Sequence, residues 1–436
     1  MRFIDLFVKM VESKRDNILR IIIEPDERIK FYNELVKKYW YPLPITRKLH
    51  LGCIYAIDSS DAIIELAGGG VIYIARSAGI SNHKDELREI NLDALYPKFE
   101  EDLNEYRKLM REHLEHKVAL KAANKLGDSD VILIDGSIFG RMSHVFMPIN
   151  ILGREDFMVK YVELFYELLE TCIEKNILLV GVAKDSRSTL FKEAFLTELL
   201  LNKISNYENE MKLKIESIIP VIFRNPRDAI KLINELQGKV NVEVIEILRE
   251  LLDPLPDTKI IISTKLKAGY SHPLKLTFKR LVRGYIEGIF KPEKRFEIAR
   301  KFLNSLPTSF NQDIEMRVQR ALKYMALYPP VASFYVKFKD NDLPLRIDVV
   351  HDEIYELESY DKVPFIAGDW EGIIGKVISI LSQLYAGLRN YNVLLTMVDN
   401  YVKFRREHKE KYKAMMEKIL GILVEQSRGA RRVSFP

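Results

Sequence analysis

Cysteine is scarce in this sequence. Only Cys53 and Cys172 occur among 436 residues, and both lie inside apolar stretches. Two isolated cysteines provide neither a disulfide framework nor a cysteine-rich zinc site, so we interpret them as small core residues in a reducing compartment, expected to be the cytoplasm. Apolar runs of about 18 residues are also missing, and the first residues form an amphipathic, charged segment. The sequence therefore predicts neither a signal peptide nor a membrane span.

A strong net charge is missing as well, since the formal charge is only +5. The hydrophobic fraction of 47% in 436 residues allows a large core with more than one subdomain. The charged fraction is 30%, rich in Lys and Glu, which is typical of a protein from a hot environment.

The charge is unevenly distributed along the chain. Residues 263–301 contain eleven Lys or Arg and three Glu, a net charge of +8, which leaves −3 for the remainder. Aromatic residues alternate with these cations: Tyr270, Phe278, Tyr285, Phe290 and Phe296. One interpretation is a DNA-binding surface that includes Lys279, Arg280 and Arg283. The other is a solvated helix face with a buried aromatic stripe.

Hydrophobic periodicity predicts an α/β protein with a partly parallel sheet. The expected strands are 52–57, 70–77, 131–134, 177–183, 333–338 and 345–350, and the clearest expected helices are 97–126, 157–174, 370–389 and 402–425. The predicted parts of the chain are an N-terminal helical segment (1–50), an α/β core (51–190), a mostly helical, basic insertion or cap (191–328) and a C-terminal part that completes the core (329–436).

Two of the predicted strands run into an aspartate. The stretch IYAIDSS ends its apolar run at Asp58, and VILIDGS ends its run at Asp135. If the two strands are parallel neighbours, the carboxylates emerge about 4.8 Å apart at one edge of the sheet. Such like charges raise a pKa unless a cation lies between them, and hard oxygen ligands favour Mg²⁺ or Mn²⁺. A pair of such ions is the usual arrangement for cleaving phosphodiesters, so we expect two.

A third acidic ligand is expected from the helix at 97–126. Glu105, Glu112 and Glu115 are all candidates, although each can also be explained as part of a surface salt bridge. Lys184 follows the strand at 177–183, where a cation can meet a phosphate oxygen, or simply pair with Asp185.

Four stretches occur in an order and spacing that resemble the NurA nucleases of archaea and some bacteria. They are AIDSS (56–60), LEHKVALKAANKLGDSDVILIDGS (114–137), VGVAKDSRS (180–188) and VPFIAGDWEGIIGKVISIL (363–381). The resemblance covers most of the chain. It implies an RNase H-like core, manganese or magnesium, 5′ to 3′ degradation of DNA and endonuclease activity on single strands. It also implies a homodimer that acts with the hexameric translocase HerA in double-strand-break end resection.

The same resemblance assigns roles to individual residues. The implied catalytic set is Asp58, Glu115, Asp135, Lys184 and Asp369, of which the four acidic residues would bind metal. Lys184 and Ser186 lie in a K-D-S element that would contact DNA. The family often has D-G-S after the first strand where this chain has D-S-S, a departure that keeps the ligand.

Two other classes of function compete with this interpretation. An ATPase of the actin or sugar-kinase type would also begin with a strand and an acidic residue, but neither a second Gly-rich phosphate loop nor a P-loop sequence is found. A non-catalytic DNA-binding or loading protein would explain the basic segment without needing Asp58 and Asp135.

Overall fold

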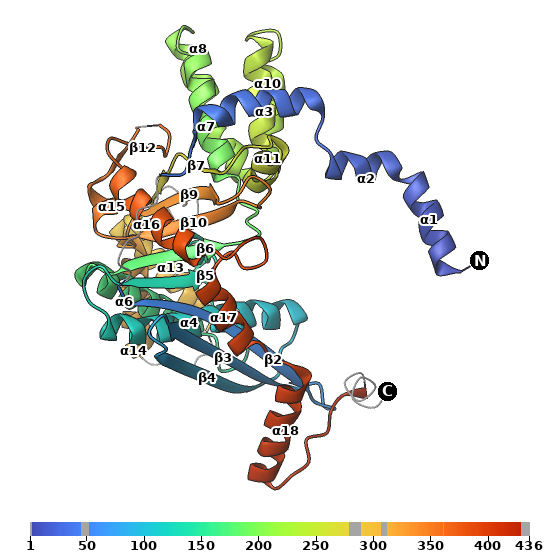
Figure 1. Cartoon of the computed structure of the whole chain (residues 1–436), viewed down its shortest axis with the longest axis vertical. Helices are drawn as coiled ribbons and strands as arrows, with labels where there is room; N and C mark the ends of the chain where they lie inside the picture. The colour runs from blue at the N-terminus through green and yellow to red at the C-terminus, as the bar shows by residue number, and fades with distance from the viewer. Residues whose placement is uncertain (1, 45–51, 279–288, 307–311, 361, 429–436) are drawn as a thin grey trace.

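A mixed β-sheet forms the centre of the computed structural model, which describes residues 2–44, 52–278, 289–306, 312–360 and 362–428. The sheet has ten strands in the order β1-β7-β9-β10-β6-β5-β2-β3-β4, with β8 paired to β9 (Figure 1). Its strands are β1 (Trp40–Tyr41), β2 (Ile54–Glu65), β3 (Val71–Ser81), β4 (Glu86–Leu95), β5 (Val131–Asp135), β6 (Leu178–Ala183), β7 (Gly269–Ser271), β8 (Leu274–Leu276), β9 (Val331–Lys337) and β10 (Leu345–Val350). The predicted α/β class with a mixed sheet is confirmed.

The middle of the sheet is parallel and apolar. β2 pairs with β5, and β5 with β6, in parallel. The apolar residues of β5 and β6 are buried, as expected for strands covered on both faces. The predicted strands at 333–338 and 345–350 correspond to β9 and β10, which pair antiparallel.

The first predicted strand is longer than expected. Instead of ending at Asp58, β2 continues to Glu65 as the partner of β3. The parallel ladder with β5, however, stops at Ile57, which pairs with Ile134. Asp58 therefore lies where the parallel ladder ends, although its strand does not end there.

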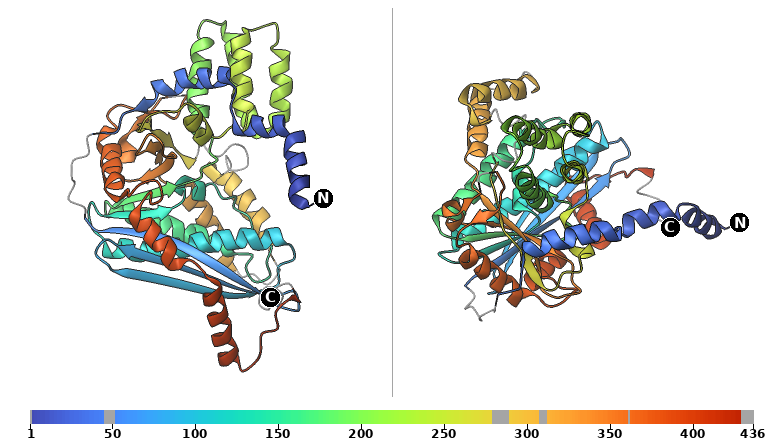
Figure 2. Two further views of the ribbon diagram at one scale, coloured as in Figure 1. Left: turned by 45° about the vertical axis from the view of Figure 1, so that its right-hand side comes forward. Right: turned by 90° about the horizontal axis from the view of Figure 1, so that it is seen from above.

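Helices cover both faces of the sheet (Figure 2). One face packs on α4 (Glu100–Lys125) and α6 (Phe157–Glu174), and the other on α16 (Glu371–Leu384) and α17 (Val393–Val402). In α4 the buried residues Leu103, Tyr106 and Met110 recur at helical spacing, which explains why this long, charged segment forms one amphipathic helix. The predicted helix at 157–174 is confirmed.

The region 191–328 is mostly helical, as predicted, but it also contributes β7 and β8 to the central sheet. Among its described residues the helices are α7 (Leu190–Lys203), α8 (Asn209–Arg224), α9 (Pro226–Glu235), α10 (Val242–Leu252), α11 (Asp257–Ser263), α13 (Pro292–Asn304) and α14 (Gln312–Ala326). Helices α7, α8, α10 and α11 gather at one end of the sheet (Figure 1).

The remaining long helices belong to the two ends of the chain. They are α1 (Phe3–Ser13), α2 (Arg15–Ile22) and α3 (Asp26–Lys38) at the N-terminus and α18 (Arg406–Leu420) at the C-terminus. Neither α1 nor α18 contains a buried residue, and both project outward in Figures 1 and 2. Among the helices that the structure describes, none combines the length and apolar character needed to cross a membrane.

Short elements complete the chain. They are α5 (Ile138–Met142), α15 (Glu353–Glu356), β11 (Glu358–Ser359) and β12 (Ile366–Ala367). β11 and β12 form a separate two-stranded sheet.

Candidate active site

Asp58 and Asp135 lie side by side at the carboxyl ends of the parallel ladder. Because Ile57 pairs with Ile134, the next residue on each strand is an aspartate, as the sequence predicted. Both carboxylates line one cleft of about 430 Å³. Burial raises the pKa of Asp58 well above its usual range, and the nearby carboxylates of Glu115 and Asp135 raise it further. The cleft therefore concentrates negative charge in a place that favours a bound cation.

Glu115 reaches the same cleft from α4. Ser59 follows Asp58 on β2, and its side chain points to the opposite face of the sheet, where its hydroxyl donates to Glu115 Oε1. The other carboxylate oxygen of Glu115 pairs with the guanidinium of Arg141. Burial raises the pKa of Glu115, although Arg141 and Ser59 favour its ionised form.

Arg141 is the buried cation of this site. It belongs to α5, just after the turn that follows Asp135, and only 5% of the residue is exposed. Besides Glu115 it donates to the backbone oxygen of Asp135 and to Nε2 of His116, both at 3.1 Å. Arg141 thereby fixes α4 against the end of β5.

Glu112, the alternative helix glutamate, has different partners. Its Oε2 lies 2.7 Å from His144 Nε2 and accepts a 2.6 Å hydrogen bond from the hydroxyl of Tyr161. Burial acts to raise the pKa of Glu112, but the hydrogen bonds with His144 and Tyr161 and the nearby charge of Arg141 outweigh burial and lower the pKa to about 2. Glu112 also lines the cleft, but its carboxylate is held by residues of the protein core.

We expect Glu112→Gln to destabilise the protein at pH 7 by up to about 3 kcal/mol, because the ionised carboxylate is stabilised in the folded chain. The pKa falls from 4.5 to about 2 on folding, so the stabilisation is complete above pH 4.5 and disappears as the pH approaches 2. Urea unfolding of wild type and variant at pH 7, 4.5 and 3 measures this loss. Exposed Glu105→Gln is the control. A difference that stays constant with pH would contradict the role of charge.

Lys184 follows β6 and faces Asp135. Its Nζ lies 2.7 Å from Asp135 Oδ2 and 4.7 Å from the ring centroid of Tyr391. Burial lowers the pKa of Lys184, but Asp135 and Tyr391 outweigh it, so that the pKa is raised and the ammonium stays charged. The lysine thus partly neutralises one of the two aspartates at the end of the parallel ladder.

No preformed metal cage is present in the part of the chain that the structure describes. No group of three or more His, Cys, Asp or Glu side chains is placed there so that it could hold an ion. In the cleft, Glu115 is engaged by Arg141 and Ser59, and Asp135 is engaged by Lys184.

A family comparison decides what kind of protein this is. The family model described as "NurA domain" matches residues 53–404. The chain belongs to the NurA family. The resemblance that the sequence motifs predicted is therefore confirmed.

Solved structures give weaker matches. "Crystal structure of NurA with manganese" shares 14% identity at a TM-score of 0.38, over 95% of this chain and 97% of that chain. "Crystal structure of NurA bound to dAMP and manganese" shares 14% at 0.42, over 94% and 97%. An endonuclease V of Ciona intestinalis with DNA shares 14% at 0.17, over 37% and 57%. A comparison with curated proteins gives no match. At these identities and TM-scores, the similarity to the solved structures supports no conclusion about the chemistry of this NurA-family chain.

The final acidic ligand implied by the resemblance is not brought to the cleft. Asp369 is exposed between β12 and α16, and it does not line this cleft. Asp399, which the sequence analysis missed, raises the pKa of Asp58 instead. It lies on α17, whose buried residues Leu395 and Val398 pack on the sheet. The spacing of those apolar residues was the available signal for this helix.

The basic segment is only partly described. Lys279, Arg280 and Arg283 lie outside the described residues, so their DNA contact stays a prediction. Of the alternating aromatic residues, Tyr270 and Phe278 are core residues at 7% and 2% exposure and cannot stack on bases, whereas Phe296 is 59% exposed. The second interpretation is thus correct in that these two aromatics are buried, but Tyr270 lies on strand β7 and not on the expected helix.

Proposed function

We propose that this NurA-family chain is a divalent-metal-dependent DNA nuclease. The observation that carries the proposal is the pair Asp58 and Asp135 at neighbouring strand positions, partly buried, with Glu115 close enough to raise the pKa of Asp58. Three carboxylates converging on one cleft are costly to a fold unless a cation or a proton relieves them. The family supports a nuclease-type role for such a cleft.

The residues fit an oxygen-ligated ion that is completed by substrate. Magnesium is commonly held by one or two carboxylates together with waters and substrate phosphate oxygens. Asp58 and Asp135 provide such a pair, with Glu115 as a third oxygen donor if Arg141 releases it. Mn²⁺ or Mg²⁺ is accordingly the proposed cofactor. The number of two bound ions remains a prediction from the sequence.

The chain's own residues would then orient the DNA. A bound divalent ion would supply a polarised phosphate and a more acidic water. Lys184, already beside Asp135, would lie near a phosphate oxygen and offset its charge. Lys108 and Arg111 line the same cleft with partly or fully exposed side chains, and they would hold the backbone on either side.

The proposed activity is 5′ to 3′ exonuclease action on DNA with endonuclease action on single strands. Incubation of the chain with 5′-labelled and 3′-labelled DNA in Mn²⁺, Mg²⁺ or chelator tests it. We expect cleavage that needs the ion and releases the 5′ label first. Binding without cleavage in every ion would instead support the non-catalytic DNA-binding alternative, and ATP hydrolysis without cleavage would support the ATPase.

Assembly is the second part of the proposal: a homodimer acting with a HerA-type hexameric ATPase in DNA end resection, in the cytoplasm. Large apolar side chains exposed on the terminal helices support a protein contact there, among them Phe3 at 90%, Phe7 at 63% and Ile419 at 79% exposure. Light scattering should give twice the chain mass at micromolar concentration. A monomer that does not co-elute with such an ATPase would contradict this part.

A further expectation concerns the basic segment. Replacing Lys279, Arg280 and Arg283 together with Gln should weaken binding to all DNA sequences alike. Each lost phosphate contact lowers the salt slope by about 0.9 on duplex and about 0.7 on single strands. Fluorescence anisotropy over a series of salt concentrations measures both effects.

The control for this triple variant removes the same charge from α18, as Lys409→Gln, Lys411→Gln and Lys418→Gln together. If both triple variants bind with the affinity and salt slope of the wild type, the segment 263–301 is ordinary surface.

A further inference from the structure

A second cleft adjoins the candidate active site and has the opposite charge. It encloses about 790 Å³ and shares Lys108, Asp135 and the turn after β5 with the first cleft. Its cationic lining residues are Lys108, Lys184, Arg187 and Arg346, and its acidic ones are Asp135 and Asp185. The first cleft has four acidic and three cationic lining residues. Asp135 therefore separates a place suited to cations from one suited to anions.

Arg346 of β10 forms the inner wall of this second cleft. Its side chain is 8% exposed, and its Nε donates to Asp348 Oδ1 and to the hydroxyl oxygen of Ser333, both at 3.1 Å. Its Nη2 is buried without a hydrogen-bond partner among the described residues. A buried N–H of a guanidinium is costly when it has no hydrogen-bond acceptor. An anionic oxygen bound at this edge of Arg346 would provide that acceptor.

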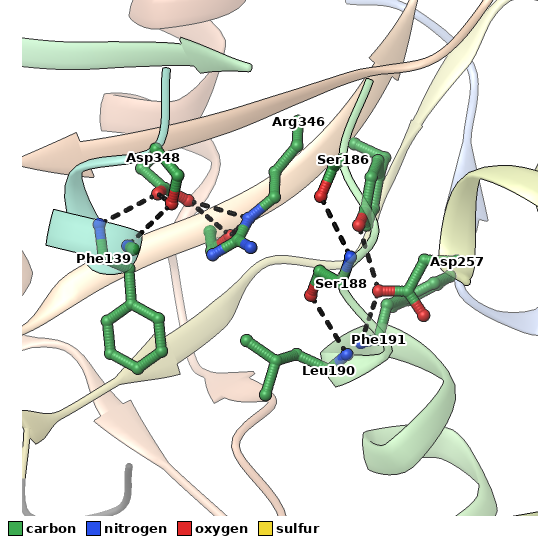
Figure 3. A network of polar contacts seen from close by, with 12 residues as sticks. Phe139, Ser186, Ser188, Leu190, Phe191, Asp257, Arg346 and Asp348 are labelled. Carbon is green, nitrogen blue, oxygen red and sulfur yellow. Dashed lines mark hydrogen bonds and ion pairs between the residues drawn. The ribbon is translucent and has the colours of Figure 1, made fainter. Parts of the chain in front are cut away.

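Asp348 holds the guanidinium but cannot satisfy all of it. Figure 3 shows Asp348 between Arg346 and the start of α5. Its Oδ2 accepts from the Ser137 hydroxyl at 2.5 Å and from the Phe139 N–H at 3.1 Å, and its Oδ1 accepts from Ser333 at 2.7 Å. These bonds use both oxygens of Asp348. They also tie Arg346 to the turn that directly follows Asp135. The second cleft is therefore held in a fixed position relative to the first.

The opposite wall is the loop between β6 and α7, which is also held in place. Asp257 accepts from the N–H group of Phe191 (Figure 3) and from that of Lys192. Thr258 donates to the backbone oxygen of Ser186. Within the loop the Leu190 N–H donates to Ser188 Oγ at 3.2 Å. The first amides of α7 are thus already satisfied, and the anion-binding groups of this wall are side chains: the Ser188 hydroxyl and the exposed Arg187.

We infer that Arg346, with Ser188 and Arg187 opposite it, binds a phosphate group of the DNA next to the one that is cleaved. This inference rests on the proposed nuclease function. A phosphate repelled by Asp58 and Asp135 needs a cationic place within one nucleotide of them, and a planar guanidinium binds phosphate oxygens in pairs. The bound group is either a terminal 5′-phosphate or an internal phosphodiester, because both present the same oxygens.

The test measures binding in chelator, where no cleavage takes place. Short single-stranded oligonucleotides carrying a 5′-phosphate or a 5′-hydroxyl are titrated into wild type, Arg346→Lys and the double variant Arg346→Gln/Asp348→Asn. The double variant avoids leaving Asp348 as an unpaired buried charge. Arg320→Gln on α14, which lines neither cleft, removes a charge elsewhere and is the control.

Loss of a charged hydrogen bond to phosphate weakens binding by about tenfold or more. If the terminal phosphate is bound, wild type and Arg320→Gln prefer the 5′-phosphate oligonucleotide by that factor, and the Arg346 variants lose the preference. If an internal phosphodiester is bound, the Arg346 variants weaken both oligonucleotides alike. Folded Arg346 variants with wild-type affinity for both would overturn the inference.

A second pair of variants tests the inference in case the Arg346 variants do not fold. Arg187→Gln and Ser188→Ala leave the buried pair intact, so they must weaken the phosphate complex, and unchanged binding in both refutes the inference. The result is separate from the proposed function. A chain that binds phosphate through Arg346 but cuts no DNA in Mn²⁺ would support the phosphate subsite and contradict the nuclease function. A chain that cuts DNA in Mn²⁺ but does not bind phosphate through Arg346 would support the nuclease function and contradict the subsite.

Discussion

Asp58→Asn and Asp135→Asn are each expected to lower DNA cleavage by several orders of magnitude while DNA binding persists. The carboxylates would position the ion that stabilises charge on the phosphate, and an amide is a much weaker ligand. Because Asp58 is buried among like charges, Asp58→Asn should keep or raise the free energy of unfolding in chelator. Gel assays with labelled DNA in Mn²⁺, together with urea unfolding, measure the two effects.

Asp61→Asn is the matched control for these variants. Asp61 lies on the same strand but pairs with Arg107 at 2.7 Å and does not line the cleft. Its loss should leave cleavage near the wild-type rate. Normal cleavage by either Asp58→Asn or Asp135→Asn would refute the metal-site assignment.

Arg141→Met is expected to destabilise the fold by about 3 to 5 kcal/mol, because removing one partner leaves the other as an uncompensated buried charge. Arg141 is the cation that Glu115 contacts, and both side chains are almost fully buried, at 5% and 7% exposure. Chemical denaturation at pH 7 in chelator measures the loss.

The double variant Arg141→Met/Glu115→Gln separates charge from packing. Removing both charges should recover most of the stability that Arg141→Met loses, which gives a strong coupling in a double-mutant cycle. Additive losses would show that Arg141 stabilises the fold through its contacts with His116 and the Asp135 backbone instead. Addition of Mn²⁺ should restabilise Arg141→Met more than wild type, since the ion would then compensate Glu115.

Much of the central fold could be predicted from the sequence because its pattern is local. The apolar runs of β5 and β6 and the helical periodicity of α4 and α6 are each complete within one segment. β4 was missed because its residues alternate with charges at the exposed edge of the sheet, a pattern that the helix after it obscured. β7 and β8 are three residues long and take their extended form from pairing with β9.

The candidate site was predicted where it depends on strand ends and missed where it depends on contacts between distant segments. Asp58, Asp135 and Lys184 each come at the end of an apolar run in the sequence, so their convergence could be expected. Arg141 became part of the site only through its contact with a helix 26 positions earlier. Asp399 comes near Asp58 only because α17 packs across the sheet, and no local feature of the sequence around Asp399 indicated that it would lie there.

The change of partners along β2 has a consequence for the order of folding. β2, β3 and β4 form a meander whose pairings are close in sequence and can form early, whereas the ladder between Ile57 and Ile134 closes over a much longer loop. Asp58 meets Asp135 only when that late ladder forms, and Asp399 arrives from near the end of the chain. A partly synthesised or partly folded chain therefore already contains Asp58 on a formed strand, whereas the cleft that joins Asp58 and Asp135 is complete only after the later segments have folded.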